Sequence, residues 1–410
     1  MKVAHLSTYD IRGGAAKAAF RIHQALQLKM ESYMLVNTRE SDDPFVRTVS
    51  SGWQRIMVRA LIKIDNQPAR KIAKEKRLTF SNGFFSTPGQ RDNLQELNAD
   101  IVNLHWINDG LISIGGIRKI DRPIVWTMHD MWPFTGGCHY TIGCEHYKTH
   151  CGKCPQLKST RTRDLSHYIF DRKEKLKGQI NFVAPSLWLK KCLSESALFS
   201  ASPVHHIPYP IDTERFKPRS RDAVREIFGL PTDKKLILFG AVNGIHDQRK
   251  GYSYLLSALD QLAQNTSVAD TELVVFGSSA PQDALIKKYR IHYIGKLTDE
   301  ISLSLLYSAA DVFVAPSTED NLPNTVIESL SCGVPVVAFR IGGMPDMIDH
   351  EKNGFLADPL SGESLAEGIR FVLDGDAAGF SENARRKVIT HYDPLIVAEQ
   401  YLKLYQSLKK

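Results

Sequence analysis

Short apolar runs alternate with longer segments in which apolar residues recur at helical spacing, almost from one end of the chain to the other. Continuous apolar runs are typical of parallel strands, because helices cover both faces of a parallel sheet. The pattern therefore predicts an α/β fold with one Rossmann-like set of strands in each half. The expected strands are Val3–Ser7, Ser32–Val36, Ile101–His105, Ile124–Met128 and Asn181–Ala184, then Lys235–Gly240, Glu272–Gly277, Ile291–Gly295, Val312–Pro316 and Val334–Phe339.

A proline-punctuated segment separates the two sets. Pro208 and Pro210 lie within His205–Asp212, and proline cannot continue a helix, so we expect an extended linker here. We predict a first domain over residues 1–205 and a second over 206–390. A last helical stretch, within 391–410, can pack back on the first domain.

Composition and charge narrow the class of protein. The chain has 410 residues, of which 43% are hydrophobic and 24% charged, as in soluble globular proteins of about two or three domains. A formal net charge of +7 favours anionic partners such as phosphates, nucleotides, acidic lipids or nucleic acid. No apolar run reaches the roughly 18 residues of a membrane span, and the start lacks a signal-peptide pattern. We therefore expect a cytoplasmic protein.

A glycine turn follows the first strand. Gly13 and Gly14 come directly before a helical stretch, where glycine lets the backbone approach an anion and the helix N-terminus offers free amides. A plain tight turn between strand and helix needs the same residues. The sequence of this turn does not decide between phosphate binding and a simple turn.

Two carboxylates lie near the expected strand at Val312–Pro316. Asp320 belongs to the following loop, and Glu328 to the helix that comes after it. Such groups accept hydrogen bonds from vicinal hydroxyls of a sugar or ribose, and the helix start near Asn324 and Thr325 suits a diphosphate. The alternative is an acidic cap with a solvated glutamate.

With these residues in view, the chain resembles the family-four retaining glycosyltransferases over nearly its whole length. The resemblance rests on the acidic pair and on four further motifs, Arg249-Lys250-Gly251, Ser331–Ala338, Ile341–Asp346 and Asn353–Leu356. Trp126–Cys138 is similar to a bacterial exopolysaccharide-type subgroup with a cysteine cluster. The resemblance implies the GT-B fold, in which two Rossmann-like domains with parallel sheets face each other across a cleft.

The same resemblance implies roles for individual residues. Glu328 would bind the ribose of the donor nucleotide, with Asn324 and Thr325 near its diphosphate. The catalytic set would be His129 and Asp320 at the donor sugar and Lys250 with Arg249 at the diphosphate, while Gly13 and Gly14 would face the cleft. From the residues alone, His129 can equally be a histidine satisfied at the end of a buried strand. His105 lies at a similar position without a motif role.

Three positions depart from the family pattern. Asp320 stands where glutamate is usual, and Pro323 stands where glycine is usual, which removes one amide donor. The usual arginine before the lysine is missing near Asn243 and Gly244, so Arg249 would take its place.

The resemblance implies a retaining glycosyltransferase that moves a sugar from a nucleotide-diphosphate sugar to a glycan or lipid-linked acceptor in bacterial surface polysaccharide biosynthesis. We expect no catalytic metal, because cationic side chains and helix amides can stabilise the leaving diphosphate. A nucleotide-sugar epimerase of the same fold is the first alternative. A zinc-dependent nucleic-acid-binding protein is the second, but it leaves Asp320 and Glu328 without a purpose, and we expect no nucleic-acid partner.

The cysteines are clustered. Cys138, Cys144, Cys151 and Cys154 follow a C-x5-C-x6-C-x2-C spacing that suits tetrahedral zinc, and four cysteine ligands leave no open position for catalysis. We predict a structural zinc. An iron–sulfur cluster and two disulfides are the alternatives.

A basic amphipathic stretch runs from Trp53 to Leu78. Its apolar residues recur at helical spacing, and it carries many positive charges, which is typical of helices that lie on an anionic membrane surface. The alternative is a core-facing helix with a solvated basic face. The basic residues are Arg55, Arg59, Lys63, Arg70, Lys71, Lys74, Lys76 and Arg77.

Overall fold

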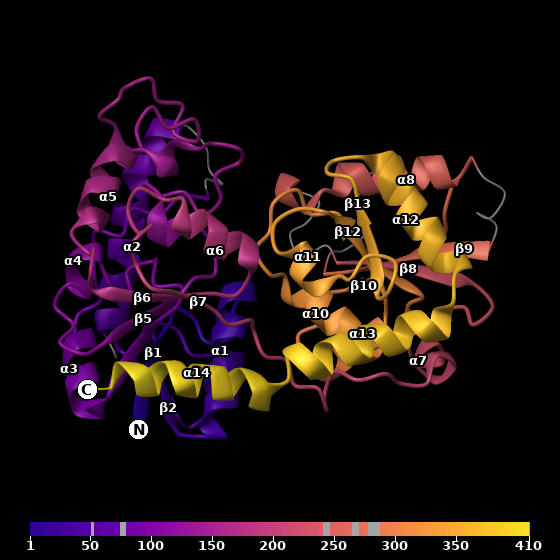
Figure 1. Cartoon of the computed structure of the whole chain (residues 1–410), viewed down its shortest axis with the longest axis horizontal. Helices are drawn as coiled ribbons and strands as arrows, with labels where there is room; N and C mark the ends of the chain where they lie inside the picture. The colour runs from indigo at the N-terminus through magenta and orange to yellow at the C-terminus, as the bar shows by residue number, and fades with distance from the viewer. Residues whose placement is uncertain (51–52, 74–78, 241–246, 265–269, 278–287, 410) are drawn as a thin grey trace. The chain divides into compact units, whose positions relative to one another are not determined.

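The computed structural model describes residues 1–50, 53–73, 79–240, 247–264, 270–277 and 288–409 (Figure 1). The chain forms two compact units. Unit 1 comprises Met1–Pro210 with Val397–Lys410, and unit 2 comprises Ile211–Ile396. The change of unit therefore falls at Pro210, and the first residues of the expected linker, His205 and His206, belong to a strand.

Unit 1 is built on a seven-stranded parallel sheet in the order β3-β2-β1-β4-β5-β6-β7. The strands predicted from the apolar runs form, and β3 and β7, which are short edge strands, were not predicted. The central strands are almost fully buried, so the core of the unit lies on both faces of the sheet. The strands are β1 Lys2–Leu6, β2 Glu31–Val36, β3 Val46–Thr48, β4 Ile101–Leu104, β5 Ile124–Thr127, β6 Ile180–Ala184 and β7 Val204–His206.

Helices cover this sheet on both sides, as the alternating pattern requires (Figure 1). They are α1 Gly14–Gln27, α2 Trp53–Ala73, α3 Gln90–Leu97, α4 Ile114–Ile117, α5 Leu165–Glu174 and α6 Leu187–Ser194, with 3-10 turns η1 Trp132–Phe134 and η2 His146–Lys148. None of the helices formed by the described residues combines the length and apolar character needed to cross a lipid bilayer.

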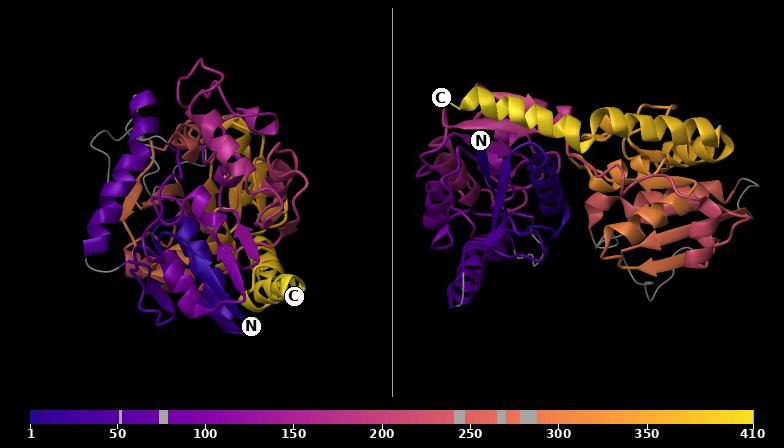
Figure 2. Two further views of the ribbon diagram at one scale, coloured as in Figure 1. Left: turned by 90° about the vertical axis from the view of Figure 1, so that its left-hand side faces the viewer. Right: turned by 90° about the horizontal axis from the view of Figure 1, so that it is seen from below.

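The C-terminal helix α14, Pro394–Leu408, packs on unit 1, alongside its sheet in both Figures 1 and 2. The Tyr405 hydroxyl accepts a hydrogen bond from the Asn103 side-chain amide at 2.7 Å, and the Tyr401 hydroxyl lies 3.1 Å from that of Thr127. Both tyrosines are fully buried. The chain end is therefore part of the core of unit 1.

Unit 2 is built on a six-stranded parallel sheet in the order β10-β9-β8-β11-β12-β13. Its strands are β8 Lys235–Gly240, β9 Thr271–Phe276, β10 Ile291–Gly295, β11 Val312–Ala315, β12 Val336–Phe339 and β13 Gly354–Ala357, of which β13 was not predicted. The other elements are α7 Arg221–Phe228, η3 Gln248–Lys250, α8 Tyr252–Leu262, α9 Glu300–Ala309, α10 Asn324–Ser331, α11 Met344–Met347, α12 Gly362–Asp374 and α13 Ala377–His391.

Each sheet has one point at which the order of its strands reverses. In unit 1 the reversal lies between β1 and β4, and in unit 2 between β8 and β11. Neighbouring strands at such a point send their connections to opposite faces, which leaves a crevice at their carboxyl ends where α/β proteins bind ligands. These two points locate the candidate site residues of each unit.

Candidate functional site

The reversal point of unit 2 brings Lys250 and Asp320 together. Lys250 ends η3, beyond β8, and Asp320 lies in the loop after β11, so the two side chains belong to neighbouring strands. The Lys250 Nζ donates to Asp320 Oδ2 at 2.7 Å. Arg249 points instead to Asp247, with its Nη2 2.8 Å from Oδ2. A cationic pair and a buried carboxylate therefore share one edge of the sheet.

Two glycines make this contact possible. Gly251 has φ +67°, and a Cβ there would lie 1.7 Å from the carbonyl oxygen of Pro316. Gly342 has φ +53°, and a Cβ there would lie 1.9 Å from the carbonyl oxygen of Asp320. No residue with a side chain fits at either position. The glycines of the two motifs thus let three loops pack around Asp320.

The electrostatics of Asp320 follow from its burial and its cation. Burial alone would raise the pKa of this carboxyl group, but the charge and hydrogen bond of Lys250, the charge of Arg249 and the amide of Asn321 outweigh it and hold the pKa below its ordinary value. Asp320 is therefore an anion at neutral pH. Lys250 keeps about a third of its side-chain surface exposed, so it can reach a further anion.

Glu328 lies inside unit 2. It is 2% exposed, and one of its oxygens accepts a hydrogen bond from the Tyr307 hydroxyl at 3.0 Å. This burial excludes the alternative of a solvated glutamate on the helix surface. Asn324 and Thr325 form the first turn of α10, next to the same loop, with Pro323 at the N-cap. The helix N-terminus and the two carboxylates are thus supplied by one segment, residues 320–328.

The reversal point of unit 1 holds the other predicted residues. Gly13 is the N-cap of α1 with φ +88°, and a Cβ there would meet no atom within 4 Å. Glycine is therefore required by the backbone conformation and leaves open space in front of the helix. His105 and His129 come just after β4 and β5 and are 2% and 8% exposed.

The histidines form a buried row that the sequence did not predict. His5 Nδ1 lies 2.8 Å from His105 Nε2, and His105 Nδ1 lies 3.0 Å from His129 Nε2. The row ends where His129 Nδ1 lies 2.8 Å from the Tyr209 hydroxyl. Both ring nitrogens of His129 are engaged within unit 1, so a ligand reaching the ring by hydrogen bonding must replace one of these partners.

Burial sets the charge of this row. It lowers the pKa of His129 to about 4, against a smaller opposing effect of Asp130, and it holds the pKa values of His5 and His105 well below the ordinary value. The three rings are therefore neutral at pH 7. Because each hydrogen bond between two rings of the row uses one ring hydrogen, the tautomer of one histidine determines that of its neighbour.

These low pKa values predict that unit 1 is sensitive to acid. Unfolded histidines titrate near 6.5, so below that pH the unfolded chain binds up to three protons that the folded row does not. The free energy of unfolding should therefore fall by about 4 kcal/mol between pH 7.5 and 5.5. All five tryptophans lie in unit 1, so urea unfolding followed by tryptophan fluorescence reports on it. Equal unfolding free energies at the two pH values would contradict the prediction.

The four clustered cysteines line one small cavity of about 20 Å³. All are free thiols, and the Gly136 amide donates to the Cys151 sulfur at 3.2 Å. Burial raises the pKa of Cys154, and the backbone amides of Leu157 and Gln156 act against this rise. The sulfurs are spaced more widely than bound zinc would draw them, because no three of them lie within 4.8 Å of one another in the described residues.

Forming thiolates in this buried cavity is costly without a cation. Burial and the neighbouring sulfurs raise the pKa of Cys138, and burial raises that of Cys151 to about 12. A metal ion removes this cost by binding the thiolates. The buried amine of Lys173 lies nearby and would offset the negative charge left on zinc with four thiolates. Four sulfurs that line one cavity are a donor set of the kind that binds structural zinc.

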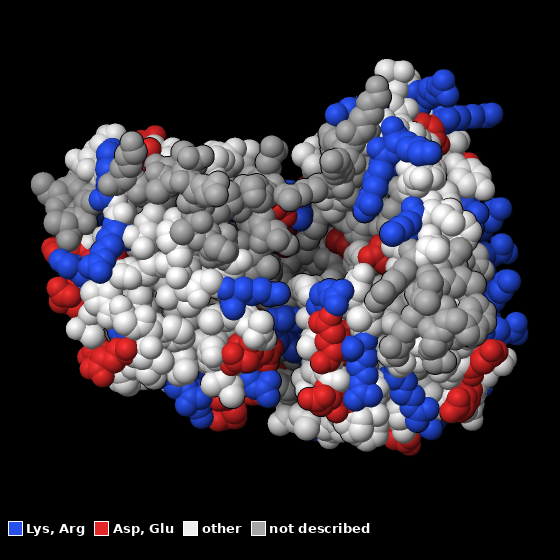
Figure 3. Space-filling view, turned by 180° about the vertical axis from the view of Figure 1, so that it is seen from behind, with Lys and Arg blue, Asp and Glu red and all other residues white. Residues whose placement is uncertain are grey.

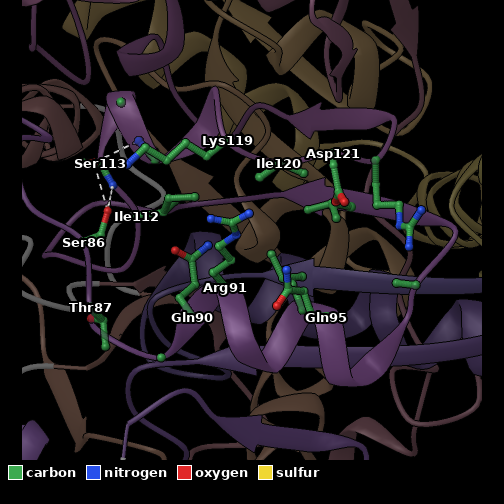
Figure 4. Close-up of a pocket in the computed structure, with 17 residues that line it drawn as sticks. Ser86, Thr87, Gln90, Arg91, Gln95, Ile112, Ser113, Lys119, Ile120 and Asp121 are labelled. Atoms are coloured by element: carbon green, nitrogen blue, oxygen red, sulfur yellow. Dashed lines mark hydrogen bonds between the residues drawn. The ribbon is translucent and has the colours of Figure 1, made fainter.

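A cavity of about 410 Å³ lies elsewhere in unit 1 and contains none of the predicted residues (Figure 4). Gln90, Arg91 and Gln95 project into it from α3, and Lys119 and Ile120 lie on the facing side. Part of its wall comes from residues that precede β4 and β5. It therefore extends toward the amino ends of these strands, away from the edge that holds the histidine row.

Comparisons with known proteins show similarity to glycosyltransferases. Residues 234–375, which contain Lys250, Asp320 and Glu328, match the family model described as glycosyl transferases group 1. The putative colanic acid biosynthesis glycosyl transferase WcaC of Escherichia coli is 27% identical over 308 residues, 71% of this chain and 70% of that protein. The D-inositol 3-phosphate glycosyltransferase of Saccharomonospora viridis is 30% identical over 213 residues, 46% of this chain and 48% of that protein. Apart from WcaC, the chain spans about half the length of the first curated relatives it matches.

Solved structures show the fold. The sucrose-phosphate synthase of Thermosynechococcus elongatus superposes with a TM-score of 0.72 at 20% identity, covering 100% of this chain and 99% of that one. Anabaena HepE in complex with UDP-glucose superposes with a TM-score of 0.67 at 17% identity, and the match covers 100% of each chain. With the two parallel sheets, these matches confirm the predicted fold class, an α/β protein with two Rossmann-like units of the GT-B type.

Proposed function

Because residues 234–375 match the group 1 glycosyl transferases and the named relatives are glycosyltransferases, we infer that this chain is a glycosyltransferase of that group. We propose that it transfers a sugar from a nucleotide-diphosphate sugar, with retention of the anomeric configuration, to a glycan or lipid-linked acceptor. The observation that carries the proposal is the ion pair of Lys250 with Asp320 at the strand-order reversal of unit 2, with Glu328 buried on the helix that follows the same loop.

The chemistry of these residues suits donor activation. Glu328 binds the ribose hydroxyls, while the amides at the start of α10, beside Asn324 and Thr325, face the diphosphate. Lys250 and Arg249 stabilise the negative charge that grows on the diphosphate as the bond to the sugar breaks. Asp320 holds Lys250 in place and accepts hydrogen bonds from the sugar. Lys250 and Arg249 already supply positive charge at this edge of the sheet, so the proposal includes no catalytic metal.

Unit 1 provides the remaining proposed contacts. Gly13 leaves open space at the start of α1, which begins at Gly14, and we assign both glycines to the approach of a substrate. We assign His129 to the donor sugar. Both nitrogens of its ring are already hydrogen-bonded, so the sugar would contact the edge of the ring or replace the Tyr209 hydroxyl as a hydrogen-bond partner. The name of WcaC supports an acceptor in bacterial surface polysaccharide biosynthesis, whereas the inositol enzymes show that relatives use other acceptors.

Incubation with nucleotide sugars tests the function. UDP-, GDP- and ADP-sugars are first screened by thermal shift, since a donor that binds the folded chain raises the unfolding temperature. UDP-glucose is the first candidate, because the structurally similar HepE binds it. Product analysis with donor alone then separates the alternatives, since an epimerase converts the donor without acceptor. Transfer to an acceptor with an inverted anomeric centre would refute retention.

We also propose that Cys138, Cys144, Cys151 and Cys154 bind one structural zinc. Protein purified without added metal should contain one equivalent of zinc, and Cys154→Ser should lower the content and the unfolding temperature of unit 1. Cys332→Ser, in unit 2, is the matched control because that thiol is also buried. Absence of zinc together with four thiols that react with an alkylating reagent would refute this proposal.

We propose that α2 brings the protein to the cytoplasmic face of a membrane. Lys63, Arg70 and Lys71 are exposed on it, as are Ile64 and Ile72, which are 54% and 47% exposed. Figure 3 shows Lys and Arg side chains, together with some Asp and Glu, over one face of the molecule. Of the predicted basic residues, Lys74, Lys76 and Arg77 lie outside the described residues.

Flotation with liposomes tests this association. Binding should require anionic lipid and weaken as salt is raised, because the basic face of α2 attracts the surface charge. Charge reversal of Lys63, Arg70 and Lys71 together should abolish it. Reversal of Lys387, Arg386 and Lys403 is the control with equal charge elsewhere on the chain. Liposome binding that survives the charge reversal on α2 would refute this proposal. It would favour the alternative, a core-facing helix whose basic face is only solvated.

A further inference from the structure

A second group of metal-ligating side chains lies beside the cysteine loop, residues 138–154. His150 belongs to this loop, while His167 and Asp171 stand one helical turn apart on α5. His150 Nε2 lies 2.8 Å from Asp171 Oδ1, and His167 Nε2 lies 3.5 Å from Asp171 Oδ2. The ligand atoms of all three residues lie within 4.8 Å of one another. Ligands around zinc at bond lengths of about 2.0–2.1 Å are separated by roughly 3 Å, so little movement is needed.

The other ring nitrogens fix the orientation of both histidines. His150 Nδ1 donates to the carbonyl oxygen of Cys151 at 2.7 Å, and His167 Nδ1 donates to the same oxygen at 3.2 Å. A neutral imidazole with its hydrogen on Nδ1 presents a lone pair at Nε2. Metal-binding histidines are held in this way, with the distant nitrogen donating to a backbone carbonyl.

The two rings turn the same kind of atom toward Asp171. Both Nε2 atoms converge on its carboxylate, with His150 Nε2 within hydrogen-bond distance of Oδ1. The rings are packed as well as hydrogen-bonded, since the centroid of His150 lies 4.2 Å from that of His167 and 4.6 Å from that of Phe170. The cluster is therefore held in place by ring packing as well as by hydrogen bonds.

We propose that His150, His167 and Asp171 bind a divalent transition-metal ion, zinc foremost, at a site distinct from the four cysteines. Two imidazoles and a carboxylate are the ligands that zinc accepts besides thiolate. The three side chains are 41%, 23% and 48% exposed, so water completes the coordination. This inference does not rest on the proposed transferase activity.

The site links the cysteine loop to α5. Cys151 offers its sulfur to the cysteine cavity and its carbonyl to both histidines of the new site, so the two sites share one residue. Binding at the second site therefore clamps the loop against the helix. It should raise the unfolding temperature of unit 1 beyond the effect of the cysteine-bound metal.

Metal titration of the full chain, without a histidine tag, tests the proposal. Chelator-treated protein is titrated with Co²⁺ and then with Zn²⁺, and the spectrum separates thiolate-bound cobalt, with its sulfur charge-transfer bands, from cobalt bound by nitrogen and oxygen. The intact chain should bind one equivalent more than the thiolate bands account for. His167→Ala and Asp171→Asn should each weaken that extra equivalent by tenfold or more and leave the thiolate bands unchanged.

His391→Ala provides the matched control, because that histidine is exposed on α13 in unit 2 and should bind no metal with its neighbours. Circular dichroism of each variant checks that the fold is kept, and Asp171→Asn serves where the alanine variant is unstable. If a variant with both His150→Ala and His167→Ala still binds the extra equivalent of metal, that metal is bound adventitiously at the surface and the proposal is wrong. A chain that binds no metal beyond its thiolates would also overturn the proposal, and would leave the cluster as a packed contact between the cysteine loop and α5.

Discussion

Replacement of Glu328 by alanine is expected to weaken binding of the donor nucleotide diphosphate by about 2 to 4 kcal/mol, or roughly 30- to 1000-fold. The carboxylate is 2% exposed and would accept hydrogen bonds from both ribose hydroxyls. Without it, the ribose loses water on binding and gains no partner. The substitution also removes the acceptor of the Tyr307 hydroxyl, which adds to the cost in the folded chain.

Three further variants separate these effects by calorimetry. Glu328→Gln keeps one acceptor oxygen and should lose less affinity than Glu328→Ala. Tyr307→Phe removes only the donor to Glu328, so it should lower stability with a smaller loss of nucleotide affinity. Asp320→Asn should weaken binding of the nucleotide sugar and leave that of the free diphosphate nearly unchanged. Equal nucleotide affinity in Glu328→Ala and the unmodified chain would refute the ribose assignment.

The sequence predicted the sheets well, because buried parallel strands are continuous apolar runs. Val312–Pro316 includes the observed strand β11 and extends it by one residue, and Val3–Ser7 is displaced by one residue from β1, Lys2–Leu6. The short edge strand β7 was missed, since His205 and His206 sit next to two prolines and lack an apolar run. The unit boundary consequently falls later than the predicted 205.

The residues of the proposed donor site could be named from the sequence because they occupy motifs, but their contacts could not be predicted. Nothing in the spacing of Gly342 shows that its backbone must touch Asp320, which follows from the packing of adjacent loops. The histidine row was missed for a similar reason. His5, His105 and His129 are separated by 100 and 24 residues and meet only because β1, β4 and β5 are adjacent. A histidine near the same end of each strand was the signal that could have found them.

Replacement of Lys250 by methionine should lower kcat by about 10²- to 10³-fold. Removal of one preorganised group that stabilises charge in the transition state has an effect of this size. The uncharged chain of methionine fills a similar volume, so the loops around Gly251 can keep their packing. KM for the donor should change less than kcat, because the charge on the diphosphate grows as the sugar bond breaks.

The same variant exposes the second role of Lys250, which is to neutralise Asp320. Once the lysine charge is gone, burial outweighs the remaining interactions and the pKa of Asp320 rises. A carboxylate with a lowered pKa contributes stability that is complete above its unfolded pKa and is lost as the pH falls through its folded value. Lys250→Met should therefore unfold at a higher pH on acid titration than the unmodified chain.

A matched control separates catalysis from the loss of an ion pair. Lys387 on α13 forms a similar pair with Asp349, at 2.9 Å, away from the proposed donor site. Lys387→Met should keep kcat within about twofold, whereas Lys250→Arg should recover part of the loss because it restores the charge. Steady-state kinetics with the donor identified by thermal shift decides between the roles. A kcat for Lys250→Met equal to that of Lys387→Met would show that Lys250 only holds Asp320 in place, and the charge on the leaving diphosphate would then have to be stabilised by Arg249 and the amides of α10.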